Sequence, residues 1–184
     1  MTRNMLRVLL ILISLLYIET EEERNFFMDV TNTTCAKFGK QLRFIECESF
    51  KFCSSHYGIS VRTIFTRDMG RTLSGRVLMK GTLRKSNRTI TILDIRIHAC
   101  SALKQMTSNM FVKRILIAFK KTNNLPTNCP LKANVLYRMD NFSVSDTYIP
   151  TFWPLFNFTY TVELYDRSYL FAMWEVSGGL VPKS

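Results

Sequence analysis

Short segments with alternating apolar and polar residues recur along most of this chain. The clearest is residues 157–165 (NFTYTVELY), where aromatic and aliphatic side chains alternate with threonine and glutamate. A period of two residues is typical of a strand with one buried face. Strand-like segments bounded by turn residues are also found at residues 41–50, 57–66, 76–84, 89–98, 133–143 and 169–176.

The apolar pattern of residues 89–98 changes face part of the way along. Ile90 and Ile92 share one face, whereas Leu93 and Ile95 share the other. Such a change predicts either a β-bulge or a strand that is buried on both faces.

Between residues 101 and 121 the spacing of apolar residues becomes three, four and seven, which is typical of a helix. Asn123, Asn124 and Pro126 then supply a stop signal. About seven strands, one inserted α-helix and hairpin-length turns predict a mainly β fold. We expect an antiparallel β-sandwich or β-cup.

Residues 149–154 (IPTFWP) cannot run through a central strand, because proline offers no N–H to the ladder. We expect this segment to cross the rim and to place aromatic side chains over the mouth of the space that the strands enclose. The alternative is that these side chains fill the core. The candidate ligand-binding residues are Met110, Phe111, Phe152, Trp153, Phe156, Phe158, Phe171 and Trp174.

The N-terminus has the outline of a secretory signal peptide. Arg3 and Arg7 precede an apolar run over residues 8–18, which is shorter than the ~20 residues that span a bilayer. The alternatives are a signal anchor or a buried helix. We assign residues 1–20 to the signal peptide, 21–40 to a loose N-terminal segment, 41–176 to a single β-sandwich domain and 177–184 to a flexible tail. The protein is therefore expected to be secreted.

The chain is basic and carries several glycosylation sequons. Its 25 Lys and Arg residues against 14 Asp and Glu residues give a formal net charge of +11, which favours anionic partners. Secretion argues against nucleic acid and favours an anionic membrane surface or a receptor; the alternative is a solvated basic face. The basic residues of the middle hairpins are Arg62, Arg67, Arg71, Arg76, Lys80, Arg84, Lys85 and Arg88. The N-x-[ST] sequons begin at Asn32, Asn87, Asn141 and Asn157.

In an oxidising compartment, we expect the five cysteines to form disulfides rather than to bind metal. Because their number is odd, one is left unpaired within the chain. We prefer a bridge between Cys100 and Cys129, which would close the helical insertion, and we pair Cys47 with either Cys53 or Cys35. The chain has no C-x-x-C motif and only two histidines, so we expect no metal site and no cofactor.

An ordered set of features carries a resemblance to a known family. The features are a strand ending at Cys47 and Glu48, a strand running into Cys100 ahead of a helix, the Asn128–Cys129–Pro130 triplet, the Tyr137 strand, and the crossing with Pro150 and Pro154. Over roughly residues 42–175 the chain resembles a large insect family of small secreted proteins filed as a domain of unknown function. That family is similar to the CheA/CheB chemosensory proteins and, more distantly, to ML-type (ganglioside-activator-like) lipid-recognition domains.

The resemblance implies a β-sandwich or β-cup that opens to admit a lipid and has no enzyme activity. Two departures are the extra Cys35 near Cys47 and Cys53, and the bulky Leu155 and Phe156 after the second proline.

The chemistry of the sequence agrees with a protein that is not an enzyme. His56 and His98 are the only histidines, and no nucleophile-elbow, HExxH or phosphate-loop motif is present. We therefore expect a secreted binding protein for a lipid or other hydrophobic small molecule, with a chemosensory or reproductive role. The alternative is a secreted protein-interaction module that binds a receptor or an anionic cell surface through its basic face.

Overall fold

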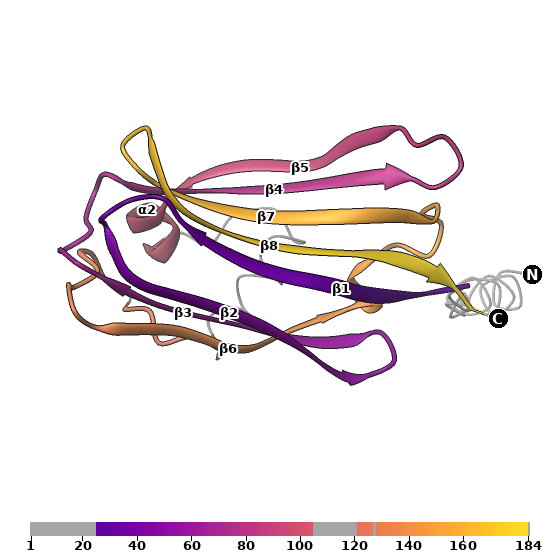
Figure 1. The fold of residues 1–184 in the computed structure, drawn as a ribbon, viewed down its shortest axis with the longest axis horizontal. Coiled ribbons are helices and arrows are strands. Elements are labelled where there is room, and N and C mark those ends of the chain that lie inside the picture. The colour runs from indigo at the N-terminus through magenta and orange to yellow at the C-terminus, as the bar shows by residue number, and fades with distance from the viewer. Residues whose placement is uncertain (1–24, 105–120, 127, 184) are drawn as a thin grey trace, which may run out of the picture.

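The computed structural model describes residues 25–104, 121–126 and 128–183, in which eight strands form two antiparallel sheets (Figure 1). The five-stranded sheet has the order β1-β8-β7-β4-β5, and the three-stranded sheet has the order β2-β3-β6. The predicted mainly β, sandwich-like fold is confirmed. The strands are β1 (Phe26–Lys37), β2 (Leu42–Cys53), β3 (His56–Phe65), β4 (Leu73–Leu83), β5 (Thr89–His98), β6 (Leu136–Ser145), β7 (Phe156–Asp166) and β8 (Tyr169–Pro182).

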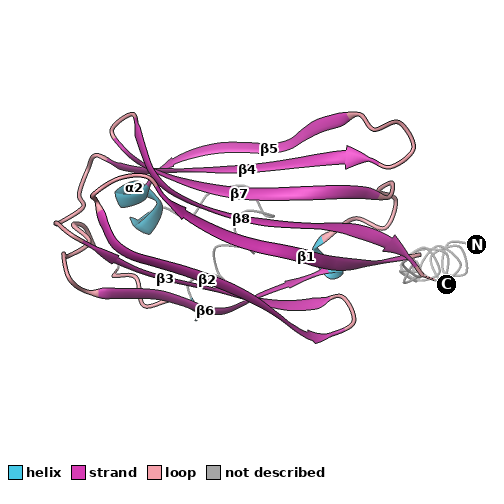
Figure 2. Ribbon diagram, viewed as in Figure 1, coloured by secondary structure: helices cyan, strands magenta, loops and turns pink. Residues whose placement is uncertain are grey.

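The described ranges contain the short helix α2 (Ala99–Lys104) and the single turn η1 (Asp146–Tyr148) (Figure 2). The helix predicted over residues 101–121 lies largely outside the described residues, as do Met110, Phe111 and the predicted signal peptide. Within the described ranges, no helix combines the length and the apolar character that a membrane span requires.

The segment predicted to be loose, residues 21–40, instead supplies an edge strand of the larger sheet. β1 pairs with β8 from Phe26 to Lys37, and Phe26 and Met28 are buried. A register shift between Val30 and Asn32 interrupts the alternation of apolar residues. The remainder of the strand is polar, so its sequence lacks the apolar period that marks a strand.

The predicted flexible tail is also part of the sheet. β8 continues to Pro182, and Leu180 is completely buried. Gly178 lies in the segment predicted to be a flexible tail, and its missing side chain makes room for a neighbour. A Cβ atom at Gly178 would lie 2.7 Å from Cζ of Phe158. The sandwich therefore runs from β1 to the end of β8, beyond the predicted limits of residues 41 and 176.

The change of apolar face in residues 89–98 is a β-bulge. Met79 pairs with Leu93, but the next residue of β4, Lys80, pairs with Thr91. Ile92 is thus the extra residue of β5, and its side chain packs against the buried cluster that contains Phe156 and Phe158. Of the two alternatives that the sequence left open, the bulge is the correct one.

The core consists of three clusters along the length of the sandwich. One end is built around Leu42, Phe65 and Phe171, the middle around Ile59, Val61 and Val176, and the other end around Phe26, Phe156 and Leu180. Each cluster combines strands of both sheets.

Two disulfides are formed. Cys100 pairs with Cys129, as we expected, and Cys47 pairs with Cys35, which joins β2 to β1. Cys53 is unpaired and exposed, so the alternative pairing of Cys47 with Cys53 is wrong. These two cysteines lie on the same extended strand, where six residues span roughly 20 Å. A disulfide needs Cα atoms within about 7 Å.

Candidate functional site

Residues in register across the larger sheet share one face, and Cys35 shows which face points inward. Its disulfide to Cys47 joins it to the opposing sheet, so the side chains in its row also face the interior of the sandwich. In strand order, this row is Cys35, Trp174, Val162, Val77 and Ile95.

Two neighbouring rows continue the same inner face. The first is Thr33, Val176, Tyr160, Met79 and Leu93. The second is Lys37, Ala172, Leu164, Gly75 and Ile97. On β4 and β5 every side chain of these three rows is apolar, apart from the glycine.

In each of these rows the most buried side chain lies on β8 or β7, and the side chains of β4 and β5 are less buried. In the first of the neighbouring rows, Val176 is 3% exposed, whereas Met79 and Leu93 are only half-buried. Within the described chain, β5 contributes no fully buried side chain. The smaller sheet has two strands fewer, and the buried clusters draw mainly on β1, β8 and β7 of the larger sheet. The inner face of β4 and β5 therefore extends outward from the buried core, against which Met79 still packs.

We call this extension the β4–β5 apolar face. Its members are the half-buried side chains of Val77, Met79, Leu93, Ile95, Ile97 and Tyr160. Tyr160 supplies its polar atom. The Tyr160 hydroxyl is protonated at neutral pH, as that of any tyrosine is, and can donate one hydrogen bond. Burial raises its pKa further, to about 12. An apolar surface with one or a few polar groups is typical of small-molecule sites.

The outer face of the same strands has the opposite character. Arg76 donates to both carboxylate oxygens of Asp94 at 2.7 Å and lies 3.5 Å from Glu163. The hydrogen bond from Arg76 holds the pKa of Asp94 below its usual value. Tyr165 donates to Glu163 at 2.7 Å. Polar groups on this outer side pair with one another, whereas the half-buried side chains of the inner side are apolar.

The structure does not bring the predicted aromatic site residues together. Phe156 and Phe158 are buried in one core cluster, Phe171 in a second, and Trp174 packs against the third. These residues fill the core, which was the alternative interpretation. Phe152 is 81% exposed. Trp153 packs on Phe156 with a ring separation of 5.7 Å, so these residues do not form an open aromatic mouth.

Sequence reasoning did not single out the β4–β5 apolar face. The signal was present in the alternation of Leu93, Ile95 and Ile97 after the change of face at Ile92. The sequence does not show that β5 pairs with β4. That pairing decides which face of β5 points inward.

The predicted basic face is partly neutralised by acidic neighbours. Arg62 lies 3.4–3.8 Å from Glu46, Glu48 and Asp140, and Arg67 is paired with Asp166. Arg76 is held by the acidic residues of the outer face. Arg84, Lys85 and Arg88 are exposed together in the β4–β5 turn, and Arg71 and Lys80 are exposed elsewhere.

All four sequon asparagines are exposed. Asn87 and Asn141 have positive φ angles of 51° and 56°, a conformation that asparagine tolerates better than most residues. The amide oxygen of Asn157 accepts a hydrogen bond from Arg84 Nε at 3.2 Å. Within the described ranges, no group of three or more His, Cys, Asp and Glu side chains is placed to hold a metal ion.

Comparison with known proteins links this part of the chain to a family. Residues 77–160 match the family described as "Protein of unknown function (DUF1091)". No curated protein matches the chain. The matched stretch begins at Val77 and ends at Tyr160, so it includes every member of the β4–β5 apolar face. The part of the chain that builds this face is therefore similar to that family.

Proposed function

We propose that the protein is a secreted, non-enzymatic binding protein that holds a lipid or another hydrophobic small molecule on the β4–β5 apolar face. The observation that carries the proposal is the decrease in burial along the inner rows, from Val176 to Leu93 in one row and from Val162 to Ile95 in the next. Two disulfides and four exposed sequons support an extracellular location.

Part of this proposal is drawn from the sequence. The chain resembles insect secreted proteins related to CheA/CheB and, more distantly, ML-type lipid-recognition domains. This resemblance suggests a chemosensory or reproductive setting in which a hydrophobic molecule is carried. The match of residues 77–160 to a family of unknown function is compatible with that role.

Binding would be driven by removal of apolar surface from water. Each buried CH₂ group contributes about 0.8 kcal/mol, so a segment of about ten methylenes would gain about 8 kcal/mol. The loss of translational and rotational freedom opposes this gain. The hydroxyl of Tyr160 would donate a hydrogen bond to one polar atom of the ligand. This bond would orient the ligand rather than add to its affinity.

The test uses the intact secreted chain and the neutral fluorescent probe N-phenyl-1-naphthylamine. Ile95→Asn places an amide on the β4–β5 apolar face, and we expect it to weaken probe binding at least tenfold. Thr91→Asn is the matched control, because Thr91 is an exposed residue of the same strand outside the face. Circular dichroism establishes that both variants are folded. Equal binding by both variants contradicts the proposal.

Native mass spectrometry after enzymatic deglycosylation gives an independent measurement. We expect an added mass of a few hundred daltons that organic extraction removes. A bare polypeptide that also fails to bind the probe would show that the apolar face is not a ligand site.

A second candidate is an interaction module that binds an anionic surface. The exposed cluster of Arg84, Lys85 and Arg88 at the β4–β5 turn favours it. Binding to phosphatidylserine vesicles that is lost at high salt, and lost on substitution of these three residues by glutamine, would support this candidate.

A further inference from the structure

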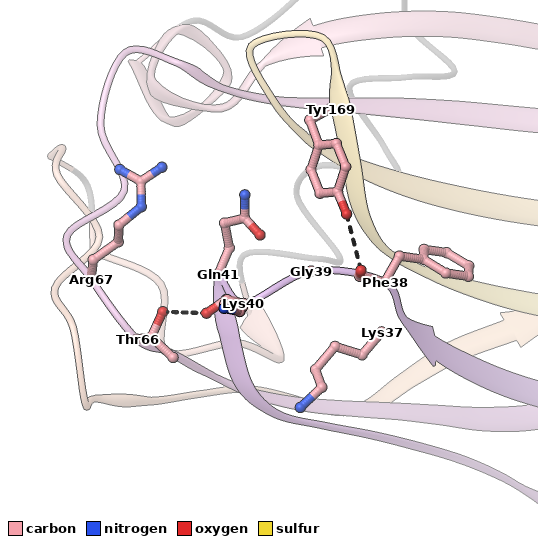
Figure 3. A pocket seen from close by; sticks show the side chains of 8 residues that line it. All are labelled: Lys37, Phe38, Gly39, Lys40, Gln41, Thr66, Arg67 and Tyr169. Carbon is pink, nitrogen blue, oxygen red and sulfur yellow. Dashed lines mark hydrogen bonds between the residues drawn. The ribbon is translucent and has the colours of Figure 1, made fainter.

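A hollow of about 800 Å³ lies at the end of the sandwich where the chain crosses from β1 to β2 (Figure 3). Its walls come from residues 37–41, from Thr66 and Arg67 after β3, and from Tyr169 at the start of β8. None of its lining residues belongs to the β4–β5 apolar face. The volume lies within the range of roughly 300–1,000 Å³ that is usual for small-molecule pockets.

Hydrogen bonds fix the backbone under this hollow. The amides of Phe38 and Gly39 both donate to the carbonyl of Phe171, at 2.8 and 3.2 Å. The hydroxyl of Tyr169 donates to the carbonyl of Phe38 at 3.0 Å, and that of Thr66 donates to the carbonyl of Lys40 at 2.6 Å. Because the site is formed in advance, a ligand would not have to order it.

Two aromatic side chains of the hollow are left half in solvent. Phe38 is 49% exposed and Tyr169 is 52% exposed. Gly39 lies beside Tyr169, and a Cβ atom there would collide with Gln41 Oε1 and come within 2.9 Å of the Tyr169 ring. The missing side chain makes room for the Gln41 amide, and the exposed part of the Tyr169 ring is the surface that a flat apolar group could cover.

The charged groups of the hollow are predominantly positive. Lys37, Lys40 and Arg67 line it, and Asp166 pairs with Arg67 through one terminal guanidinium nitrogen. An arginine carries five N–H donors, so this contact leaves most of the fork free to bind an anion.

Gln41 adds a polar group to the same space. Figure 3 shows its amide projecting between Arg67 and Tyr169, on the same side of the β1–β2 connection as both. Its Oε1 atom is buried and has no hydrogen-bond partner within the part of the chain that the structure describes. Lys37 points away, toward the carbonyl of Arg43, to which it donates at 3.4 Å.

We infer that this hollow is a second binding site, for an organic anion in which a carboxylate or sulfonate is joined to a flat apolar body. Arg67 and Lys40 hold the anionic group, and the rings of Tyr169 and Phe38 cover the apolar body. This site differs from the proposed lipid site in its position and in its requirement for charge.

The test is isothermal titration calorimetry of the intact chain with 1-naphthoate and, as the neutral counterpart, 1-naphthylmethanol. We expect 1-naphthoate to bind at least tenfold more tightly, and this preference to shrink severalfold between 50 and 500 mM salt. Equal affinity for the acid and the alcohol overturns the inference.

Two double variants locate the site. Lys40→Gln combined with Arg67→Lys removes one charge and the guanidinium fork but retains a cation beside Asp166, and we expect at least tenfold weaker binding of 1-naphthoate. Lys80→Gln combined with Lys85→Gln removes two exposed cations from β4 and its turn, and should leave binding unchanged.

Ile95→Asn separates this site from the β4–β5 apolar face. The inference predicts that Ile95→Asn retains the affinity of the wild-type protein for 1-naphthoate. If Ile95→Asn abolishes binding while the variant of Lys40 and Arg67 retains it, the anion binds on the apolar face and the inference is wrong.

Discussion

Cys35 and Cys47, whose Cα atoms lie 5.9 Å apart, covalently join an edge strand of the larger sheet to an edge strand of the smaller one. The two sheets are therefore tied along the side formed by β1 and β2. The β4–β5 apolar face lies toward the opposite edge of the larger sheet. This arrangement holds the core together on one side and leaves apolar surface on the other.

Removal of this tie should destabilise the fold. The disulfide closes a loop with a sequence separation of 12 residues, for which loop-closure entropy predicts about 3 kcal/mol. We expect Cys35→Ser with Cys47→Ser to lower the free energy of unfolding by about that amount, measured by urea denaturation without reductant. Cys53→Ser is the control and should change stability by less than about 0.5 kcal/mol, because Cys53 is unpaired and exposed. A similar loss in both proteins would contradict the disulfide assignment.

The strands that could be predicted from the sequence are those with a clean apolar period. β5 has the predicted bounds of residues 89–98, and β7 differs from its prediction by one residue at each end. β1 was missed because only its first residues alternate, and the rest pairs through its backbone with β8. The order of the strands could not be predicted, because β4 pairs with β7 across a long stretch of sequence and nothing local encodes that pairing.

The candidate site was less predictable than the fold. Phe156, Phe158 and Phe171 are conspicuous in the sequence, yet an aromatic side chain on a strand is equally suited to a core or to a pocket. The register of Ile95 with Val77 and Val162 decides which side chains extend beyond the smaller sheet, and register is a property of the assembled sheet.

Two glycines on the inner face should respond to substitution in opposite directions. A Cβ atom at Gly178 would press on the carbonyl oxygen of Asp29 and on the Phe158 ring, so Gly178→Ala should cost about 1–3 kcal/mol of stability. At Gly75 the nearest atom is the carbonyl oxygen of Glu163 at 3.7 Å, so Gly75→Ala should be neutral or stabilising by up to about 1 kcal/mol. Urea denaturation of both variants provides the measurement. A stable Gly178→Ala protein would show that the end of β8 is not packed as described.

Adjacent aromatic residues in the rim segment should differ sharply in their contribution to stability. Trp153 packs on Phe156 in a core cluster, so Trp153→Ala should lower the free energy of unfolding by about 2 kcal/mol. Phe152 is mostly exposed, and Phe152→Ala should change it by less than about 0.5 kcal/mol. Thermal unfolding followed by circular dichroism distinguishes the two. If Phe152→Ala loses more stability than Trp153→Ala, then Phe152, and not Trp153, packs in the core.

Tyr160 should make stability depend on pH in the alkaline range. Its pKa of about 12 in the folded protein exceeds the ~10 of an unfolded tyrosine, because burial disfavours the phenolate. The protonated hydroxyl therefore contributes stability that is fully present below pH 10. That contribution is lost as the pH rises from about 10 toward about 12. Two pH units correspond to a loss of at most about 3 kcal/mol.

Urea denaturation at pH 7, 9, 10 and 11 measures this effect. We expect the wild-type protein to lose stability above pH 10 more steeply than Tyr160→Phe, which has no hydroxyl to ionise on the apolar face. Tyr148→Phe removes an exposed tyrosine in η1 and serves as the control for loss of one phenol. If Tyr160→Phe and the wild-type protein lose stability in parallel, burial does not raise the pKa of the Tyr160 hydroxyl in the folded protein.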